Sequence, residues 1–160
     1  RGNIIHTLLQ RLPELDDSSW RKAAKSFLKL ATHKLTMEMQ NEILEETLTI
    51  LNHPEFHNIF GLSSRAEVPL VGKINGQVIS AQIDRLVIEK NRIIIVDYKT
   101  NRVPPSDSTQ VPEIYLLQMS AYKMALERIY PKHNIECLLL WTVGPILMRL
   151  QPEILTTHSP

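Results

Sequence analysis

The chain has 160 residues, of which 43% are hydrophobic and 22% charged, a composition typical of one globular domain with one core. Its 18 basic and 17 acidic residues leave a net charge of +1, which by itself does not indicate nucleic-acid binding. The longest apolar runs, residues 93–96 and 137–143, are too short to cross a bilayer, and no secretory signal is recognisable, so we expect no membrane contact.

The cysteine content excludes several kinds of structural and metal site. The single Cys137 excludes an internal disulfide framework and a four-cysteine zinc or iron–sulfur site within this chain. A cytoplasmic location is therefore expected. Because the chain starts at Arg1 without a methionine, we also expect a fragment of a longer protein.

Helical patterns occupy the first sixty residues. Apolar residues at helical spacing predict a helix over residues 4–12, which Pro13 ends. Asp and Ser residues at 16–19 can cap a second helix, and Thr36 precedes a third. Pro54 and Gly61 suit the start and end of a short fourth helix.

The middle of the chain changes to the period of strands. Asn75-Gly76 predicts a hairpin turn, within a turn region over residues 72–76, and a second turn is expected near Lys90-Asn91. The predicted strands cover residues 67–71, 78–88, 92–99, 135–143 and 146–150, with a loop over 103–112 and a helix over 113–130 between the third and fourth.

The order of the elements indicates the fold class. Helices, three meandering strands, a helix and one or two further strands predict an α/β or α+β fold with a mixed central sheet flanked by helices. We expect a single domain over residues 1–160, with a helical part at 1–62, a core at 63–150 and a tail at 151–160.

Asp97 and Lys99 are the most informative pair of charges. They end an apolar strand and project from the same face, because side chains alternate with a period of two. Half-buried charges are costly unless they pair or hold a metal. A simple salt bridge at the strand exit is the alternative interpretation.

Asp84 strengthens the metal interpretation. Pairing around the turn near Lys90-Asn91 places Asp84 roughly opposite Asp97, and two adjacent carboxylates are tolerable if a divalent cation lies between them. Oxygen ligands suit Mg²⁺ or Mn²⁺ better than zinc. Such a centre, with Lys99 beside it, is well matched to phosphodiester hydrolysis. Glu67 is either a further ligand or water anchor, or a solvated strand start.

Other candidate residues carry weaker signals. His6 is alone on an amphipathic helix, where a structural role is more common than metal ligation. Gln118 and Tyr122 are four residues apart and share one face of the helix after the Asp97 strand, with Tyr115 on the same stripe. That face could contact a phosphate or a base, or simply pack on the sheet.

Several motifs together resemble a known family, the RecB-type nucleases of the PD-(D/E)XK superfamily. The resemblance covers nearly the whole chain and is greatest to the C-terminal nuclease domains of AddA helicase–nuclease proteins, in their alphaproteobacterial form. The motifs are Gly2-x-x-x-His6-x-Leu8-Leu9-Gln10, Ala66-Glu67-Val68-Pro69-Leu70, Gln82-Ile83-Asp84-Arg85-Leu86, Ile95-Val96-Asp97-Tyr98-Lys99, Tyr115-x-x-Gln118-x-x-x-Tyr122 and Leu140-Trp141-Thr142.

The resemblance implies roles residue by residue. The implied metal ligands are His6, Asp84, Asp97 and the backbone carbonyl of Tyr98. Lys99 matches the catalytic lysine of the family. In addition, Glu67 matches the first acidic position, and Gln118, Tyr122 and Arg85 are expected to contact nucleic acid.

The resemblance also implies an activity and its setting. We expect a Mg²⁺-dependent deoxyribonuclease, with Mn²⁺ as a substitute and no iron–sulfur cluster, that cuts single strands delivered by a helicase during double-strand-break repair. Its partners are DNA and an AddB-like subunit, the latter through the parent protein. The alternatives are a non-cleaving DNA-binding or docking module and a restriction-type phosphodiesterase on the same fold.

Overall fold

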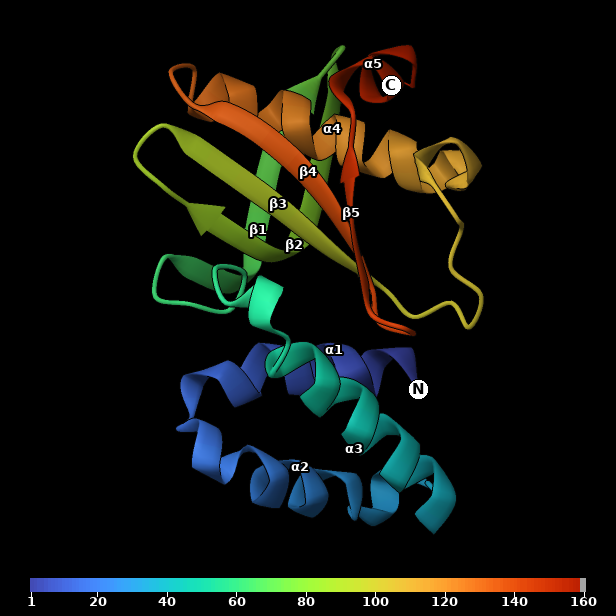
Figure 1. Ribbon diagram of the computed structural model, residues 1–160. Helices are drawn as coiled ribbons and strands as arrows, with labels where there is room; N and C mark the ends of the chain where they lie inside the picture. Colours follow the sequence, from blue (N-terminus) through green and yellow to red (C-terminus); the bar gives the residue numbers. More distant parts are fainter. Residues whose placement is uncertain (159–160) are drawn as a thin grey trace.

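The computed structural model describes residues 1–158, and its elements follow the predicted order (Figure 1). The helices are α1 (Gly2–Arg11), α2 (Trp20–Leu28), α3 (Met37–Leu51), α4 (Glu113–Ile129) and α5 (Pro152–Thr157). The strands are β1 (Ser64–Ile74), β2 (Gln77–Ile88), β3 (Arg92–Lys99), β4 (Asn134–Trp141) and β5 (Ile146–Leu150). Within the described residues, none of the helices has the length and apolar character needed to cross a bilayer.

The five strands form one sheet in the order β1-β2-β3-β4-β5. Neighbouring strands are antiparallel except β3 and β4, which are parallel and are joined by the crossover through α4. The N-terminal helices lie on one face of this sheet and α4 crosses the other (Figure 1). This mixed sheet flanked by helices confirms the predicted fold class.

Local sequence signals explain how these elements begin and turn. Asn75 and Gly76 both have positive φ, 50° and 80°, as the tight turn between β1 and β2 requires. The Glu89 N–H donates to the Arg92 carbonyl at 2.9 Å, which closes the predicted second hairpin. Thr36 caps α3, its hydroxyl accepting from the Met39 N–H at 3.2 Å.

Three elements differ from the sequence-based expectation. Strand β1 extends to Ile74 and not only to residue 71, because Gly72 belongs to the strand and not to the turn. Gly72 lies against α4, where an added Cβ would be 3.7 Å from the Cβ of Ala125. The short fourth helix is one 3-10 turn, Pro54–Phe56. Part of the expected tail is helix α5, which packs on α4 and buries Leu155.

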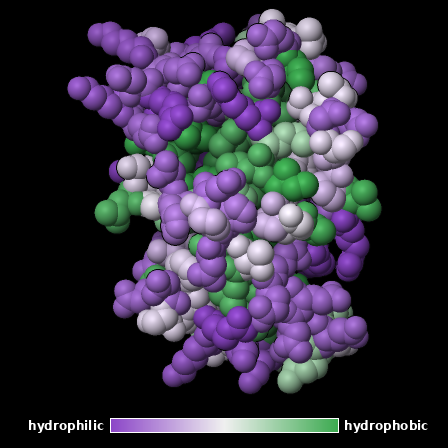
Figure 2. Space-filling view, in the orientation of Figure 1, coloured by the Kyte–Doolittle hydropathy of each residue, from purple (hydrophilic) through white to green (hydrophobic). Residues whose placement is uncertain are grey.

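Strand β3 is buried on both faces. Ile93 and Ile95 pack with α4 in one apolar cluster, whereas Ile94 and Val96 pack with the N-terminal helices in the other. Figure 2 shows hydrophobic residues gathered over the sheet on one face of the molecule, between hydrophilic regions over the N-terminal helices and at the opposite end. The site residues on β3 are therefore held between two packed layers.

A buried arginine joins the helical layer to the sheet. Arg85 on β2 is 4% exposed. Its guanidinium donates to the Leu9 carbonyl, the Ser64 hydroxyl and the Tyr98 hydroxyl, each at 3.0 Å. The ring of Phe60 lies 5.1 Å from its central carbon, at a distance that favours a cation–π contact. Arg85 thus ties α1, β1 and β3 together.

Replacing this guanidinium tests its structural role. Arg85→Met keeps the apolar stem but leaves buried acceptors unpaired, so the free energy of unfolding should fall by about 2–4 kcal/mol. Urea denaturation measures the loss, and Arg65→Met, at an exposed position of β1, should stay within about 0.5 kcal/mol of the unsubstituted chain. Equal stability of Arg85→Met and the unsubstituted chain would contradict the role.

Candidate active site

Asp84 lies at the corner where β2 separates from β3. The last paired residues there are Arg85 and Val96, so the register places Asp84 opposite Asp97, as the hairpin turn predicts. The backbone ladder stops at this point, and the Asp84 carboxylate instead accepts the Tyr98 N–H at 2.8 Å. A side chain has taken the place of a backbone hydrogen bond, which orients Asp84 toward β3.

Glu67 faces the same corner from β1. The register between Ala66–Arg85 and Val68–Ile83 places Glu67 opposite Asp84, but the two are not paired. Glu67 has a φ of 50°, uncommon for a residue with a side chain. Partial burial, followed by the charge of Asp84, raises the pKa of Glu67. Three acidic residues from three strands therefore converge here.

His6 approaches Asp84 from α1. Its Nδ1 lies 3.2 Å from a carboxylate oxygen of Asp84, and its ring stands edge-on to that of Tyr98, with centroids 5.4 Å apart. Burial lowers the pKa of His6, but the hydrogen bond and charge of Asp84, together with Asp97 and Glu67, outweigh it and raise the pKa overall. The helix thus supplies a partly buried imidazole to the acidic corner.

Asp97 and Lys99 form an ion pair beside this corner. Asp97 is 5% exposed, and its carboxylate lies 2.5 Å from the Lys99 ammonium. Burial, followed by the charge of Asp84, raises the pKa of Asp97 to about 6 even though Lys99 and His6 lower it. Ionised Asp97 is therefore in an unfavourable environment that an additional positive charge would relieve.

Helix α4 holds the other side of Lys99. The Lys99 ammonium donates to Gln118 Oε1 at 3.1 Å, and Gln118 Nε2 donates to the Tyr122 hydroxyl at 3.0 Å. The ammonium also lies 3.9 Å from the centre of the Tyr115 ring. Sequence reasoning assigned Tyr115 no role of its own, although its three-residue spacing from Gln118 placed it on this stripe.

The donor types at the corner fit a hard divalent cation. Asp84 and Asp97 offer carboxylate oxygens and His6 an imidazole nitrogen, a set compatible with Mg²⁺ or Mn²⁺. Across residues 1–158, however, no group of three or more His, Cys, Asp or Glu side chains is arranged to hold a metal ion. Instead, Asp97 pairs with Lys99, and Asp84 contacts His6.

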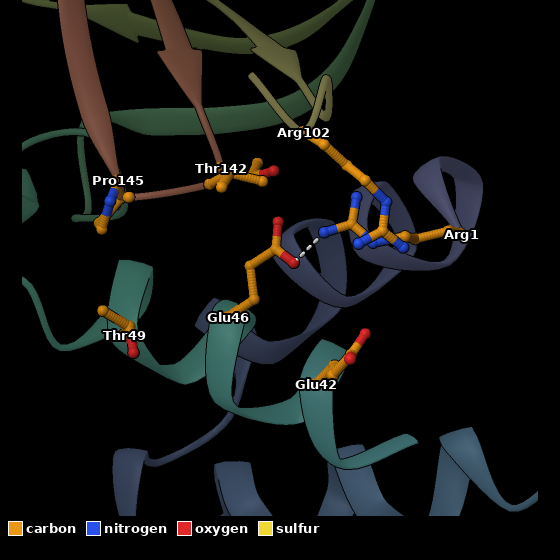
Figure 3. Close-up of a pocket in the computed structure, with 9 residues that line it drawn as sticks. Arg1, Glu42, Glu46, Thr49, Arg102, Thr142 and Pro145 are labelled. Carbon is orange, nitrogen blue, oxygen red and sulfur yellow. Dashed lines mark hydrogen bonds and ion pairs between the residues drawn. The ribbon is translucent and has the colours of Figure 1, made fainter. Parts of the chain in front are cut away.

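Two cavities differ in their relation to these residues. One of about 380 Å³ lies beside the corner and is lined by His6, Glu67 and Asp84. Another, of about 450 Å³, is lined by Arg1, Arg102 and other residues, none of which is a predicted site residue (Figure 3). There Glu46 points to Arg1 and binds it, closing α1 onto α3. Of these two cavities, the first is therefore the one that contains predicted site residues.

The structure corrects the expectation that Arg85 contacts nucleic acid. Its guanidinium is buried and donates to three acceptors inside the fold. A group in that position has a structural role. The other predicted side chains, those of His6, Glu67, Asp84, Asp97, Lys99, Gln118 and Tyr122, lie around one corner of the sheet.

The raised pKa of Asp97 predicts a pH-dependent gain in stability on its neutralisation. Because the folded pKa of about 6 exceeds the unfolded value of 3.8, ionising Asp97 destabilises the fold as pH rises from about 4 to above 6. In EDTA, Asp97→Asn should therefore unfold at a higher free energy at neutral pH, by on the order of 2 kcal/mol, and show no gain near pH 4.

Urea denaturation across this pH range measures the difference. Asp16→Asn, at an exposed position, serves as the control and should show no such trend. A difference between Asp97→Asn and the unsubstituted chain that does not vary with pH would contradict the shifted pKa.

Comparison with curated proteins finds relatives of one kind. An ATP-dependent helicase/nuclease subunit from Alkaliphilus oremlandii is 29% identical over 149 residues, which cover 81% of this chain and 12% of that protein. A protein of the same name from Ruminiclostridium cellulolyticum is 36% identical over 66 residues, which cover 41% of this chain and 5% of that protein. The chain thus spans only a small part of the relatives it matches.

The chain is also similar to a solved structure and matches one family model. The crystal structure of SSO0001 aligns over 96% of this chain and 71% of that one, with 18% identity and a TM-score of 0.41. The family model described as the PD-(D/E)XK nuclease superfamily matches residues 1–155. Because that match includes the acidic corner, its lysine and nearly all of the fold around them, the chain belongs to the PD-(D/E)XK nuclease superfamily.

Proposed function

We propose that this domain hydrolyses DNA phosphodiester bonds with Mg²⁺, or Mn²⁺ in its place, and that Asp84, Asp97 and Lys99 form its centre. The observation that carries the proposal is the meeting of these three residues at one sheet corner, within a chain of the nuclease superfamily. A buried acid whose pKa is raised by burial and by a neighbouring carboxylate, as that of Asp97 is, suits a cation, and the lysine beside it suits a phosphate.

The proposed ligands are His6, Asp84, Asp97 and the Tyr98 carbonyl. A divalent cation there supplies positive charge against the phosphate and makes water a better nucleophile. Asp97 would offer the cation its carboxylate, one oxygen of which faces Lys99. Lys99 would turn its ammonium to a phosphate oxygen and stabilise the charge that develops there.

Neighbouring residues support these groups. Gln118, held by Tyr122, keeps the Lys99 ammonium on the α4 side of the corner when it leaves Asp97. We assign Glu67 the acceptance of a hydrogen bond from water in the cavity, which it lines with Asp84. We assign Gln118 and Tyr122 a contact with the DNA strand at the same point.

The helicase/nuclease relatives support a proposal for the wider setting. We propose a cytoplasmic helicase–nuclease that works with an AddB-like subunit, cutting single strands as an exonuclease while broken ends are prepared for recombinational repair. The likeness to the alphaproteobacterial form remains a prediction. No iron–sulfur cluster is proposed, since the one cysteine, Cys137, is buried away from the corner.

Removing Asp97 tests the centre. Asp97→Ala should lower cleavage of end-labelled single-stranded DNA at least about 100-fold in Mg²⁺ or Mn²⁺, because it deletes a metal ligand. Asp16→Ala controls for loss of an exposed acid and should cut normally. If Asp97→Ala cuts as fast as the unsubstituted chain, the centre is misassigned. If no chain cuts, and calorimetry detects no Mn²⁺ binding, the domain is a non-cleaving module.

Removing Lys99 separates the role of charge stabilisation from metal binding. Lys99→Ala should lower kcat about 100-fold, the usual size of a lost transition-state contact. The Kd for Mn²⁺, measured by calorimetry, should stay the same or fall, because the variant removes a positive charge that competes with the cation for Asp97. Lys90→Ala, in the exposed turn, is the matched control. A larger loss of Mn²⁺ affinity than of kcat would reverse this assignment.

A further inference from the structure

A groove between α1 and β2 extends from the acidic corner. Besides His6, Glu67 and Asp84, the cavity of about 380 Å³ is lined by four residues to which sequence analysis assigns no role: Asn3, Thr7, Gln10 and Gln82. Because both sets line one cavity, a ligand that fills it meets these four side chains as well as His6, Glu67 and Asp84.

The four residues present neutral hydrogen-bonding groups. Asn3, Thr7 and Gln10 are spaced by four and three residues, so they form one stripe along α1, and Gln82 precedes Asp84 by two on β2. All four are exposed or half-buried. In the part of the chain that the structure describes, the side-chain amides of Gln10 and Gln82 form no hydrogen bond, so both keep donors and acceptors for a ligand.

Charge distinguishes this groove from the other side of the corner. No lysine or arginine of residues 1–158 lines it, while Glu67 and Asp84 are acidic. A phosphate is therefore disfavoured in the groove, since like charges repel and the counterions of a strand are displaced only by cations. The ammonium of Lys99 lies on the α4 side instead, next to Gln118. The two sides of the corner thus suit different parts of one nucleotide strand.

We propose that the groove holds bases of an unpaired DNA strand, hydrogen-bonded at their edges by the Gln10 and Gln82 amides, while the scissile phosphate faces Lys99. The inference rests on the proposed nuclease function. A primary amide carries a donor and an acceptor side by side, as base edges do. In a duplex the Watson–Crick edges are occupied, so a groove that binds them selects single strands.

The test measures binding in EDTA, where no cleavage occurs. Fluorescence anisotropy gives the Kd of a short labelled single strand and of the same sugar–phosphate strand without bases. Removing both amides with Gln10→Ala and Gln82→Ala should raise the Kd of the normal strand about tenfold. The Kd of the abasic strand should change less than about twofold, because its contacts are elsewhere. Gln77→Ala, an exposed amide near the tip of the same hairpin, is the control and should bind normally.

The outcomes decide the proposal separately from the nuclease activity. The proposal is overturned if the double variant binds both strands more weakly by the same factor, or if its Kd for the normal strand is unchanged. It is also overturned if the unsubstituted chain binds the normal and the abasic strand with the same Kd. Gln82→Glu, which keeps the shape but replaces the donor with a charge, should weaken the normal strand as alanine does. Metal-dependent cleavage by the unsubstituted chain is measured in parallel, so a domain that binds bases but never cuts would refute only the proposed hydrolysis.

Discussion

The Arg85 guanidinium fixes the arrangement on which the site depends. It binds the Leu9 carbonyl of α1 and the Tyr98 hydroxyl of β3, at 3.0 Å each, from inside the fold. Leu9 lies about one helical turn beyond His6, and Tyr98 directly follows Asp97. The same buried cation therefore sets the distance between the histidine on the helix and the acid on the strand. Burying a charge without a contacting carboxylate is costly, and these hydrogen bonds offset the cost.

The corner itself concentrates features that a purely structural sheet avoids. Glu67 has a positive φ, the ladder stops between Asp84 and Asp97, and acidic residues face each other across neighbouring strands. The side-chain alternation of β2 also changes here: Arg85 faces the N-terminal helices, whereas Ile83, two residues earlier, packs with α4. Local strain and like charges persist where the surrounding fold is well packed, and they cluster at functional sites.

Much of this was predictable because the strongest signals are local. The hairpin turn fixes the register, and register alone places Asp84 opposite Asp97. Burial of Arg85 had a signal in the sequence, where it follows Ile79, Ala81 and Ile83 at every second position, but a motif resemblance suggested a DNA contact instead. The sequence pattern did not show that Arg85 faces the layer opposite to Ile83. The positive φ of Glu67 had no such signal, because no propensity favours that backbone conformation at glutamate. Helix α5 is six residues long and depends on packing against α4, which periodicity does not detect.

The near-neutral charge of the chain agrees with the division of DNA contacts that we propose for the corner. A net charge of +1 is small for a protein that binds a polyanion. In that proposal the protein contacts phosphate chiefly through Lys99, and the bases bind in the amide-lined groove. The protein then needs few cationic side chains to bind the strand, and its affinity depends less on salt. Weak intrinsic attraction also suits a domain tethered to a helicase, where the linkage supplies a high local concentration of strand. Strong non-specific attraction would instead hold the product after each cut and slow release.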